Sequence, residues 1–371
     1  MQSLDVLDTK PKVQLNVVET SGNARERGLQ YGRKCKGLID RFVDALYVSY
    51  KESHGRSKNQ LLLQAKRYVP FLEEYSSEVA EEIRGIAEGA GRAYEELVMT
   101  VAYYEIGETR SSLPVQGCTA LAATGKGTVD GTVYIGQTWD DNLAYWWDGQ
   151  INTLLNMRCD SGLNILAYTY PGIPPAAGLN SEGISLCWNS LHCEQAAVGV
   201  PTYAIVREVL GARRIGDAIG AITRAKRAES FNMMIADKDG EVYDIEATPN
   251  ELDILYATKF ISHANHFKSR KLRIQRDTIL DILPDTIVRD NRMSKLLEQN
   301  CGNIDLDKSM QLLRDHVNYP HSICKHAHKT RRLIFDLTYA SWVLVPAKRE
   351  MWITHGIPCQ SEFVRYSAQS S

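Results

Sequence analysis

The chain has 371 residues, of which 44% are hydrophobic and 24% are charged, and its formal net charge at pH 7 is -2. A chain of this length can bury a sizeable core, as one large domain or as two. The near-neutral charge gives no sign of a nucleic-acid partner or of an acidic membrane surface. No apolar run approaches the ~20 residues of a membrane-spanning helix. The composition therefore predicts a globular protein without nucleic-acid or membrane partners.

The eight cysteines are sparse for this length and include no Cys-x-x-Cys pair. Such usage is typical of reduced thiols in a reducing compartment. The first eight residues are acidic and lack the apolar core of a secretory signal, so we expect a cytoplasmic location. Five of the cysteines are expected to be small packing residues without a chemical role: Cys35, Cys159, Cys187, Cys301 and Cys359.

The first third of the chain is predicted to be helical. Apolar residues between Cys35 and Leu46 recur at the i, i+3, i+4, i+7 spacing of one helix face. Further helices are predicted in three places: over residues 61–72, from a cap at Ser76 or Ser77, and from about residue 94 toward 106.

After Cys118 the pattern changes to strands separated by turns. Strands are predicted over residues 132–135, 151–155, 163–169, 183–188, 231–236, 241–246, about 252–263, 331–338, 341–345 and 351–354, with a hairpin turn at 237–240. Helices are predicted over residues 203–227, 268–276, 291–299 and 306–316. Helices followed by strands with further helices predict an α+β fold in which helices cover sheets. The break near residues 111–117 is a candidate boundary, or a processing loop inside one fold.

The pair Gly117-Cys118 permits an unusual reaction. A thiolate is a strong nucleophile but needs a base or a lowered pKa, and no papain-type motif surrounds Cys118. The Cys118 thiol could instead attack the Gly117 carbonyl, after which water would cleave the thioester. Gly117 has no Cβ and so admits this close approach. The freed α-amine has a pKa near ~7.7–8.0, close to the thiol's ~8.5, and can serve as its base.

Short segments with a specific order and spacing surround this pair. They are Ala24-Arg25-Glu26-Arg27-Gly28-Leu29-Gln30-Tyr31-Gly32, Glu82-Ile83-Arg84-Gly85-Ile86-Ala87-Glu88-Gly89-Ala90, Gly117-Cys118-Thr119, Gly136-Gln137-Thr138-Trp139-Asp140, Gly178-Leu179-Asn180-Ser181-Glu182-Gly183, Asn189-Ser190-Leu191-His192, His263-Ala264-Asn265-His266 and Asn318-Tyr319-Pro320-His321-Ser322-Ile323-Cys324. Together they resemble the acyl-coenzyme A:6-aminopenicillanate acyltransferase family, whose members are self-cleaving N-terminal nucleophile (Ntn) hydrolases. The resemblance covers nearly the whole chain.

The resemblance implies an αββα sandwich, with two antiparallel sheets between helix layers. It also implies self-cleavage between Gly117 and Cys118 into a helical light chain, residues 1–117, and a heavy chain, residues 118–371. The two chains would stay together as an intramolecular heterodimer and form one Ntn-hydrolase domain. Cys118 would begin an inner strand.

Residue roles follow from the same resemblance. Asp140 is expected to orient the Cys118 thiol and amine, and the Asn265 side chain to donate to the oxyanion. Asn189 is expected to be a second donor through its backbone N–H, and Ser322 to serve processing or substrate binding.

The sequence departs from the family pattern in three places. Thr138 stands where the family usually has Asn, and Lys325 where it often has Arg, which is not equivalent for holding a carboxylate. Tyr103 and Tyr104 replace an arginine common before Glu105. These changes are expected to alter the substrate pocket and to put carboxylate recognition in question.

The implied function is cleavage of a linear acyl amide through a Cys118 thioester, with transfer of the acyl group to water or an amine. A small acyl amide, and an acyl-coenzyme A or amine acceptor, are the expected partners. No cofactor or metal is expected. Two alternatives remain open: an unprocessed thiol hydrolase that pairs Cys118 with a histidine, and a non-catalytic member of the fold.

Several other clusters have ordinary interpretations as well as functional ones. His263 and His266 lack a matching carboxylate or thiol for a metal. The histidines near Cys324 (His321, His326 and His328) could suggest a metal site, but they are expected to form a polar surface turn. Tyr145-Trp146-Trp147 is expected to belong to a sheet core or an interface rather than an acyl pocket. The basic run from Lys268 to Arg276 is expected to be a solvated helix face.

Overall fold

Two β-sheets and the helices that cover them make up the part of the chain that the structure describes. The computed structural model describes residues 15–107, 117–142, 151–193, 197–273, 280, 283–326 and 336–369. The large sheet has eight strands in the order β1-β4-β5-β6-β7-β8-β9-β10, and the small sheet has six in the order β11-β2-β3-β12-β13-β14. Neighbouring strands are antiparallel, as expected, except that β1 pairs with β4 in parallel.

The strands of the large sheet are β1 (Asn16–Gly22), β4 (Thr153–Cys159), β5 (Asn164–Thr169), β6 (Ala177–Asn180), β7 (Ser185–Ser190), β8 (Phe231–Ala236), β9 (Val242–Ala247) and β10 (Leu252–Tyr256). Those of the small sheet are β11 (Phe260–His263), β2 (Cys118–Gly125), β3 (Gly131–Asn142), β12 (Asp336–Val345), β13 (Glu350–Thr354) and β14 (Phe363–Ser367). The helices before Cys118 are α1 (Ala24–Lys34), α2 (Lys36–His54), α3 (Lys58–Lys66), α4 (Val69–Tyr75), α5 (Ser77–Ala90), α6 (Tyr94–Val101) and α7 (Tyr103–Gly107). Those after it are α9 (Thr202–Leu210), α10 (Ile215–Arg224), α11 (Asp285–Gln299), α12 (Leu306–Leu312) and the 3-10 helix η3 (Pro346–Lys348).

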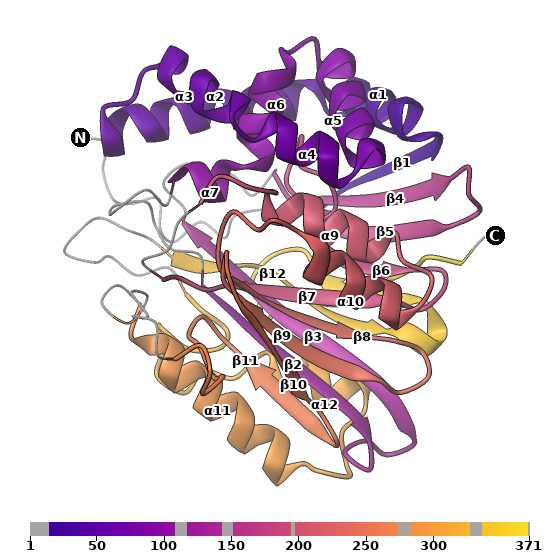
Figure 1. Ribbon diagram of the computed structural model, residues 1–371. Helices are drawn as coiled ribbons and strands as arrows, with labels where there is room; N and C mark the ends of the chain where they lie inside the picture. Colours follow the sequence, from indigo (N-terminus) through magenta and orange to yellow (C-terminus); the bar gives the residue numbers. More distant parts are fainter. Residues whose placement is uncertain are drawn as a thin grey trace.

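The two sheets lie face to face between helices (Figure 1). Helix α9 packs on β6 and β7 and α10 packs on β8, so both cover the large sheet. Helix α11 packs on β2 and β11, and α12 on β3 and β12, so both cover the small sheet. Strands β2 and β3 pack against β7 of the other sheet. This helix–sheet–sheet–helix order confirms the predicted αββα sandwich, and α1 adds a further contact with β1 and β4.

Tryptophan rings pack together beside the start of β2. Trp139, Trp188 and Trp342 are among the largest fully buried side chains. The ring centroid of Trp139 lies 5.5 Å from that of Trp188 and 5.9 Å from that of Trp342. Because Trp139 lies opposite Cys118 in the β2–β3 ladder, this core is adjacent to the predicted nucleophile.

Helices α1 and α5 pack with their backbones almost in contact. A Cβ added to Gly28 would lie 2.0 Å from the carbonyl oxygen of Glu82, and one added to Gly85 would lie 2.3 Å from that of Arg25. Any larger residue would therefore push the helices apart. The two glycine-containing segments recognised in the first third of the chain thus have a packing role.

A buried ionic cluster connects α1 and α5 to α9. Nη2 of Arg27 and Nη2 of Arg207 each lie 3.1 Å from Oε2 of Glu82, and the three side chains are at most 3% exposed. Both arginines also reach Oε1 of Glu78, at 2.9 and 3.0 Å. The cluster joins residues before Cys118 to residues after it.

Some elements differ from the sequence-based prediction. The helix predicted over residues 61–72 is divided between α3 and α4, and the helix over 203–227 breaks at Gly211 into α9 and α10. Strands β1, β6 and β14 were not predicted; β1 and β14 lie at sheet edges, and β6 has only 4 residues. The basic segment forms no helix over residues 268–273; residues 270–273 form a turn. The aromatic cluster at residues 145–147 lies outside the described residues.

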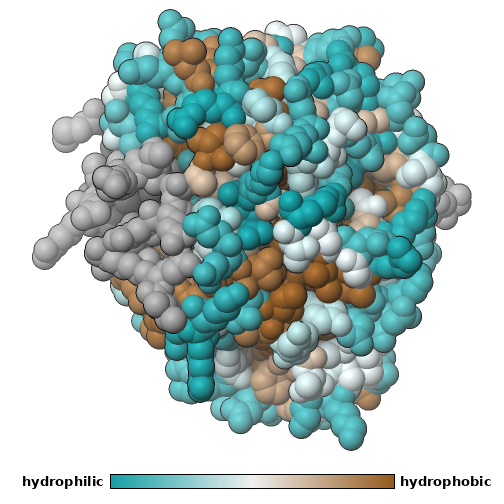
Figure 2. All heavy atoms as spheres, in the orientation of Figure 1, coloured by the Kyte–Doolittle hydropathy of each residue, from teal (hydrophilic) through white to brown (hydrophobic). Residues whose placement is uncertain are grey.

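Figure 2 shows one face of the molecule, on which polar residues dominate and apolar residues gather near the centre. Within the described ranges, no helix has both the length and the apolar character needed to cross a bilayer.

Candidate active site around Gly117 and Cys118

Cys118 is the first residue of β2 and is 2% exposed. It lies opposite Trp139 of β3, and directly opposed residues carry their side chains on the same face. Gln137 shares that face, and its Oε1 accepts a hydrogen bond from the backbone N–H of Trp188 in the large sheet at 3.3 Å. The Cys118 thiol therefore faces the space between the two sheets.

The carbonyl of Gly117 is held by the neighbouring strand. Its oxygen accepts a hydrogen bond from the backbone N–H of Asp140 at 2.9 Å. A donor at this distance also stabilises negative charge on the same oxygen. The β2–β3 ladder thus directs a backbone N–H at the carbonyl oxygen of the peptide bond that is predicted to be cut.

The side chains of Asp140 and Lys325 enclose the α-carbon of Gly117. A Cβ added to Gly117 would lie 2.7 Å from Lys325 Nζ and 3.1 Å from Asp140 Oδ2. Both side chains are fully buried. The Thr338 hydroxyl links them, since it donates to Asp140 Oδ1 at 2.7 Å and accepts from the Lys325 backbone N–H at 2.9 Å. The predicted cut site lies between a carboxylate and an ammonium.

Asn265 holds the backbone nitrogen of Cys118. Its Oδ1 accepts from the Cys118 N–H at 3.0 Å, and its Nδ2 donates to the carbonyl oxygen and the hydroxyl of Ser190, both at 3.2 Å. The backbone N–H of Asn265 donates to Thr286 Oγ1 at 2.6 Å, which fixes the segment after β11. In this arrangement the amide is an acceptor toward the nitrogen that a cut would turn into an α-amine.

Arg289 is a site residue that the sequence did not reveal. Its Nη1 donates to the carbonyl oxygen of Cys118 at 2.5 Å and its Nη2 to Asn265 Oδ1 at 2.9 Å. It is 1% exposed and is oriented by Asp285, whose Oδ2 accepts from Nε at 2.8 Å. The only sequence signal was the i, i+4 spacing of Asp285 and Arg289, which is common on solvated helices.

Asp285 is shared between two cations. Its Oδ2 lies 3.4 Å from Lys325 Nζ and 2.8 Å from Arg289 Nε. Burial alone would raise the pKa of Asp285, but Lys325 and Arg289 outweigh burial and lower the pKa to about 2. The carboxylate therefore stays charged and keeps both cations in place.

The buried side chain of Asn189, in β7, faces the space between the sheets. It shares its face of β7 with Cys187, whose Sγ accepts from Trp342 Nε1 in the small sheet at 3.3 Å. Neither Oδ1 nor Nδ2 of Asn189 has a hydrogen-bond partner among the described residues. An unpaired buried amide is costly, which makes it a candidate ligand-binding group.

The backbone N–H of Asn189 points elsewhere. Leu191 N–H donates to Ser230 O at 3.4 Å, and Trp188 N–H points to Gln137, away from β8. Alternation along an antiparallel ladder then directs the Asn189 N–H toward β8. The expected donor role of Asn189 thus fits its side chain better than its backbone.

The hydroxyl groups of Thr138 and Ser322 bond to backbone groups. Thr138 Oγ1 accepts from the Thr119 N–H at 3.2 Å, on the face of the small sheet opposite to that of the Cys118 thiol. The Ser322 hydroxyl donates to the carbonyl oxygen of Cys324 at 2.5 Å. Ser322 therefore supports the loop that carries Lys325.

Burial raises the pKa of the Cys118 thiol well above its usual value, and the Asp140 carboxylate raises it further. A hydrogen bond from the Asp140 backbone and the charge of Arg289 act in the opposite direction. None of the charged groups with the largest effect on this thiol is a histidine. The surroundings therefore favour a neutral thiol in the uncut chain.

Tyr104 and Glu105 of α7 contact residues that follow Cys118 in the chain. The hydroxyl of Tyr104 lies 3.1 Å from His192 Nε2, and its ring packs edge-on against Trp188 with the centroids 5.8 Å apart. Glu105 Oε1 accepts from the Thr202 N–H at 2.6 Å. Burial raises the pKa of Glu105 to about 7. These contacts join α7 to the strand that carries Asn189.

Residues 128–359 match the family described as acyl-coenzyme A:6-aminopenicillanic acid acyl-transferase. Over 322 residues the chain is 27% identical to the acyl-coenzyme A:6-aminopenicillanic-acid-acyltransferase 40 kDa form of Emericella nidulans, covering 83% of this chain and 84% of that protein. Gly117 and Cys118 precede the family match. It contains the other predicted site residues: Thr138, Asp140, Asn189, Asn265, Ser322 and Lys325.

Two solved structures are similar at a lower level. A variant of conjugated bile acid hydrolase from Clostridium perfringens gives a TM-score of 0.48 at 13% identity, covering 67% of this chain and 92% of that one. Penicillin V acylase from Agrobacterium tumefaciens gives 0.43 at 10% identity, covering 64% and 82%. At these scores the similarities add nothing to the fold, which is defined by the chain's own sheets and helices.

Proposed function

Because the chain belongs to the acyl-coenzyme A:6-aminopenicillanic acid acyl-transferase family, we propose that it is a self-cleaving enzyme that transfers acyl groups from linear amides. Cys118 becomes the N-terminal residue of the larger piece and forms a thioester with the acyl group. Water or an amine then accepts that group. Besides a linear amide, an acyl-coenzyme A is a candidate acyl donor, because the name of the Emericella relative includes acyl-coenzyme A. The observation that carries the proposal is the Asp140 N–H on the Gly117 carbonyl beside the Cys118 thiol.

Self-cleavage begins with attack of Cys118 Sγ on the carbonyl carbon of Gly117. The S–C bond forms, the C–N bond to Cys118 breaks, and the thiol proton ends on the released amine. Water then hydrolyses the thioester, which restores the thiol and leaves a carboxylate on Gly117. The Asp140 N–H, 2.9 Å from the Gly117 oxygen, stabilises the charge that develops there.

After the cut, the new α-amine of Cys118 acts as the base for its own thiol. Asn265 Oδ1, 3.0 Å from this nitrogen, accepts a hydrogen bond from one of its N–H groups and so orients the nitrogen lone pair. The nearby Arg289 guanidinium favours the neutral amine, which offsets the opposite effect of the Asp140 carboxylate. A neutral amine can take the thiol proton and later give it to the leaving amine.

The unpaired Nδ2 of Asn189 is the proposed donor to the oxyanion of the external substrate. Donors of this kind contribute about 2.7–4 kcal/mol when present in the transition state. The Asn265 Nδ2 group, which now contacts Ser190, is the second candidate. Tyr104, which packs against Trp188 in the strand that carries Asn189, is proposed to contact the acyl or amine part of the substrate.

The two pieces, residues 1–117 and 118–371, are proposed to stay together as one enzyme. The pairing of β1 with β4 and the Arg27–Glu82–Arg207 cluster both cross the cut. All eight cysteines are free thiols, which fits a reducing cytoplasm where Cys118 remains available. The alternative of an unprocessed Cys/His hydrolase is disfavoured, because no hydrogen bond joins Cys118 to a histidine within the described part of the chain.

Mass spectrometry and gel electrophoresis of the purified full chain test the proposal. The wild type should give two pieces, the larger with Cys118 and a free α-amine at its start, whereas Cys118→Ala should remain a single chain. Cys187→Ala is the matched control, because it removes a buried thiol from the same space between the sheets. A wild type that stays whole, or a Cys118→Ala chain that is still cut, would overturn the proposal.

Activity is tested on the cut enzyme with a panel of linear acyl amides and acyl-coenzyme A thioesters, each with and without an amine acceptor. Release of free acid alone identifies a hydrolase, and a new amide identifies an acyltransferase. Trapping the acyl group on Cys118 as a thioester is expected with either outcome. An active enzyme without such an adduct contradicts the proposed mechanism.

A further inference from the structure

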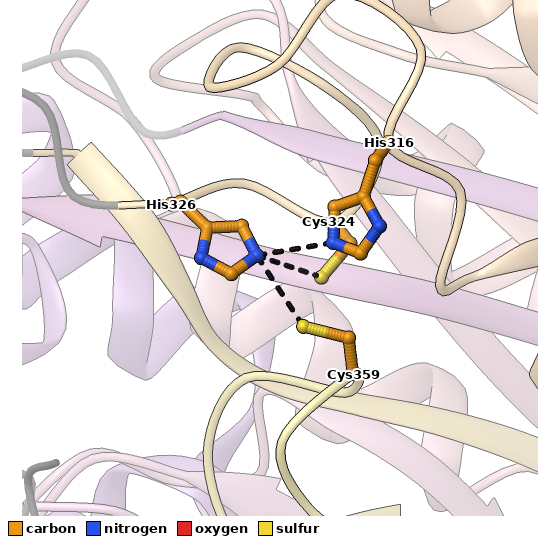
Figure 3. Close-up of side chains that lie close together, drawn as sticks. All are labelled: His316, Cys324, His326 and Cys359. Atoms are coloured by element: carbon orange, nitrogen blue, oxygen red, sulfur yellow. Dashed lines mark hydrogen bonds between the residues drawn. The ribbon is translucent and has the colours of Figure 1, made fainter.

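Four side chains that the proposed reaction does not use point toward one another near the surface. They are His316, Cys324, His326 and Cys359 (Figure 3). Their potential ligand atoms all lie within 4.8 Å of one another. His326 Nε2 lies 3.1 Å from His316 Nε2, 3.3 Å from Cys359 Sγ and 3.8 Å from Cys324 Sγ.

These distances match the edges of a small tetrahedron. Zinc binds His nitrogen at ~2.0–2.1 Å and Cys sulfur at ~2.3 Å, so tetrahedral ligand atoms lie roughly 3.3–3.8 Å apart. The three distances measured from His326 fall in or within a few tenths of an ångström of that range. Two thiolates and two imidazoles form a common structural zinc set, and soft sulfur ligands disfavour magnesium and calcium.

The sequence pattern placed Cys324 and His326 together in a polar surface turn, but it linked neither His316 nor Cys359 to them. His316, Cys324 and His326 are separated by irregular spacings, and Cys359 is a further 33 residues along the chain. Cys359 was expected to be a buried packing residue, but it is exposed and lies beside His326. The fold brings the ligands together by placing the turn that contains Cys359 against the loop before β12.

We propose that His316, Cys324, His326 and Cys359 bind one structural Zn²⁺. The ion joins the loop of residues 316–326 to the turn of residues 357–360. Arg314 supports the same junction, since its Nε donates to the Pro358 carbonyl oxygen at 2.8 Å and its Nη2 to that of Ser361 at 3.1 Å. The two segments are therefore already held at a distance that suits a shared ion.

The position of the site gives it a specific consequence. Lys325 lies between two of the ligands, Cys324 and His326, and its Nζ contacts Asp285 beside Gly117. A metal bound on both sides of Lys325 fixes the backbone from which this buried ammonium extends. The zinc site is thus a support for the loop, with no part in bond breaking.

The two cysteines of this cluster could instead form a disulfide. Cys324 and Cys359 are close enough to be candidates for a disulfide after a small movement, and the two histidines would then be bystanders. Zinc binding requires both cysteines to be reduced, whereas a disulfide requires both to be oxidised. Elemental analysis together with thiol counting separates them.

The test uses full-length protein that is expressed in zinc-supplemented medium and purified without a chelator. The wild type should contain about one zinc per chain, and cobalt replacement should give a thiolate charge-transfer band and the visible bands of tetrahedral cobalt. The double variant His316→Asn with Cys359→Ser should no longer bind stoichiometric zinc. Losing an outer-shell partner lowers metal affinity by roughly 10–100-fold, and losing two direct ligands should lower it further. Both changed residues are exposed, so the fold should persist, which circular dichroism checks.

The matched control changes a cysteine and a histidine of intermediate exposure outside the cluster, Cys301→Ser with His355→Asn, and should retain the zinc. Hydrogen exchange gives a second measurement: chelation should speed exchange in residues 316–326 of the wild type and leave the double ligand variant unchanged. Zinc well below one equivalent in the supplemented wild type, a Cys324–Cys359 disulfide in the isolated protein, or full zinc retention by the ligand variant would each overturn the proposal.

Discussion

The backbone N–H of Asp140 lies 2.9 Å from the carbonyl oxygen of Gly117, so one rung of the β2–β3 ladder ends on the peptide bond before Cys118. The same rung that builds the sheet can therefore stabilise an oxyanion during cleavage. This relationship makes the geometry of Gly117 and its neighbours open to direct tests.

Replacing Gly117 by alanine should slow self-cleavage by about 100-fold, the effect expected of a displacement near 1 Å at a reacting group. The new Cβ would lie 2.7 Å from Lys325 Nζ and 3.1 Å from Asp140 Oδ2, so both groups must move. The appearance of the two pieces over time on a gel gives the rate. Gly216→Ala, which meets nothing within 4 Å, should cleave like the wild type. Equal rates for all three chains would contradict the role given to this enclosure.

Replacing Arg289 by glutamine should remove the contacts to the Cys118 carbonyl and to Asn265 and strongly slow self-cleavage. It should also lower the free energy of unfolding by about 3–5 kcal/mol, because Asp285 loses a buried partner. Arg292→Gln, one turn away on the same helix, removes only a partly exposed pair with Asp315 and should cleave normally.

Arg289→Lys separates positioning from stability. A lysine keeps the charge near Asp285 but cannot reproduce the forked contacts. We expect most of the thermal stability to return while cleavage stays slow. Cleavage at the wild-type rate in Arg289→Lys would show that charge alone is sufficient.

The rate of self-cleavage should rise by about tenfold per pH unit through the neutral range, because only the thiolate form of Cys118 attacks. Burial and the Asp140 carboxylate raise the pKa of this thiol, so the rise should continue past the ~8.5 of an ordinary cysteine. The profile is measured by incubating the uncut chain for a fixed time at pH values from 6 to 10, roughly the range over which a thiol titrates. Mass spectrometry then gives the fraction of chain that is cut. A plateau below the ordinary value would contradict this environment.

Asn189→Leu should raise stability and lower activity. Both polar atoms of Asn189 are buried without a partner among the described residues, so an apolar side chain of similar size removes a penalty of about 1–3 kcal/mol. The same change removes the proposed oxyanion donor and should lower kcat by roughly 100- to 1000-fold while leaving KM nearly unchanged. Thermal unfolding and steady-state kinetics on the cut enzyme measure the two effects.

Asn232→Leu is the comparison for that prediction. Asn232 lies opposite Asn189 on β8, but its Nδ2 bonds to Asp244, so its loss should destabilise the protein. If Asn189→Leu also destabilises the protein and leaves kcat unchanged, the amide has a structural role instead.

His263→Gln should make the protein less stable in a pH-dependent manner. Burial lowers the pKa of His263, but Asp244 and Glu246 outweigh burial and raise it to about 9 from 6.5. The folded value exceeds the unfolded one, so this stabilisation is complete below about pH 6.5 and is lost as pH rises through 9. The variant should lose about 3–5 kcal/mol at pH 6, and the difference from the wild type should shrink by pH 9.5. His355→Gln should show no such trend.

Much of the site could be predicted because its residues occupy short motifs that the fold brings together. Gly117-Cys118 and Trp139-Asp140 were recognised as separate motifs, and the structure pairs them across one hairpin. Asn265 follows the strand on the other side of β2. These motifs could therefore be recognised in the sequence, and the small sheet brings them together.

The remaining parts depend on long-range geometry that local patterns do not encode. The segment near residues 252–263 was predicted as strands, but β10 joins the large sheet and β11 the small one. Arg289 lies on a helix that was predicted only from residue 291. Thr338, which joins Asp140 to Lys325, was predicted only as the end of a strand, with no role in the site. These contacts exist only once both sheets and α11 are packed.

The parallel pairing of β1 with β4 makes the first piece of a cut chain a structural complement of the second. β1 forms an edge of the large sheet over Asn16–Gly22, and the buried arginines of α1 and α9 share one carboxylate of α5. Separating the pieces would strip a strand from that edge and leave charges without partners. The pair should consequently melt in a single transition, and two separately expressed fragments should reassemble by strand complementation.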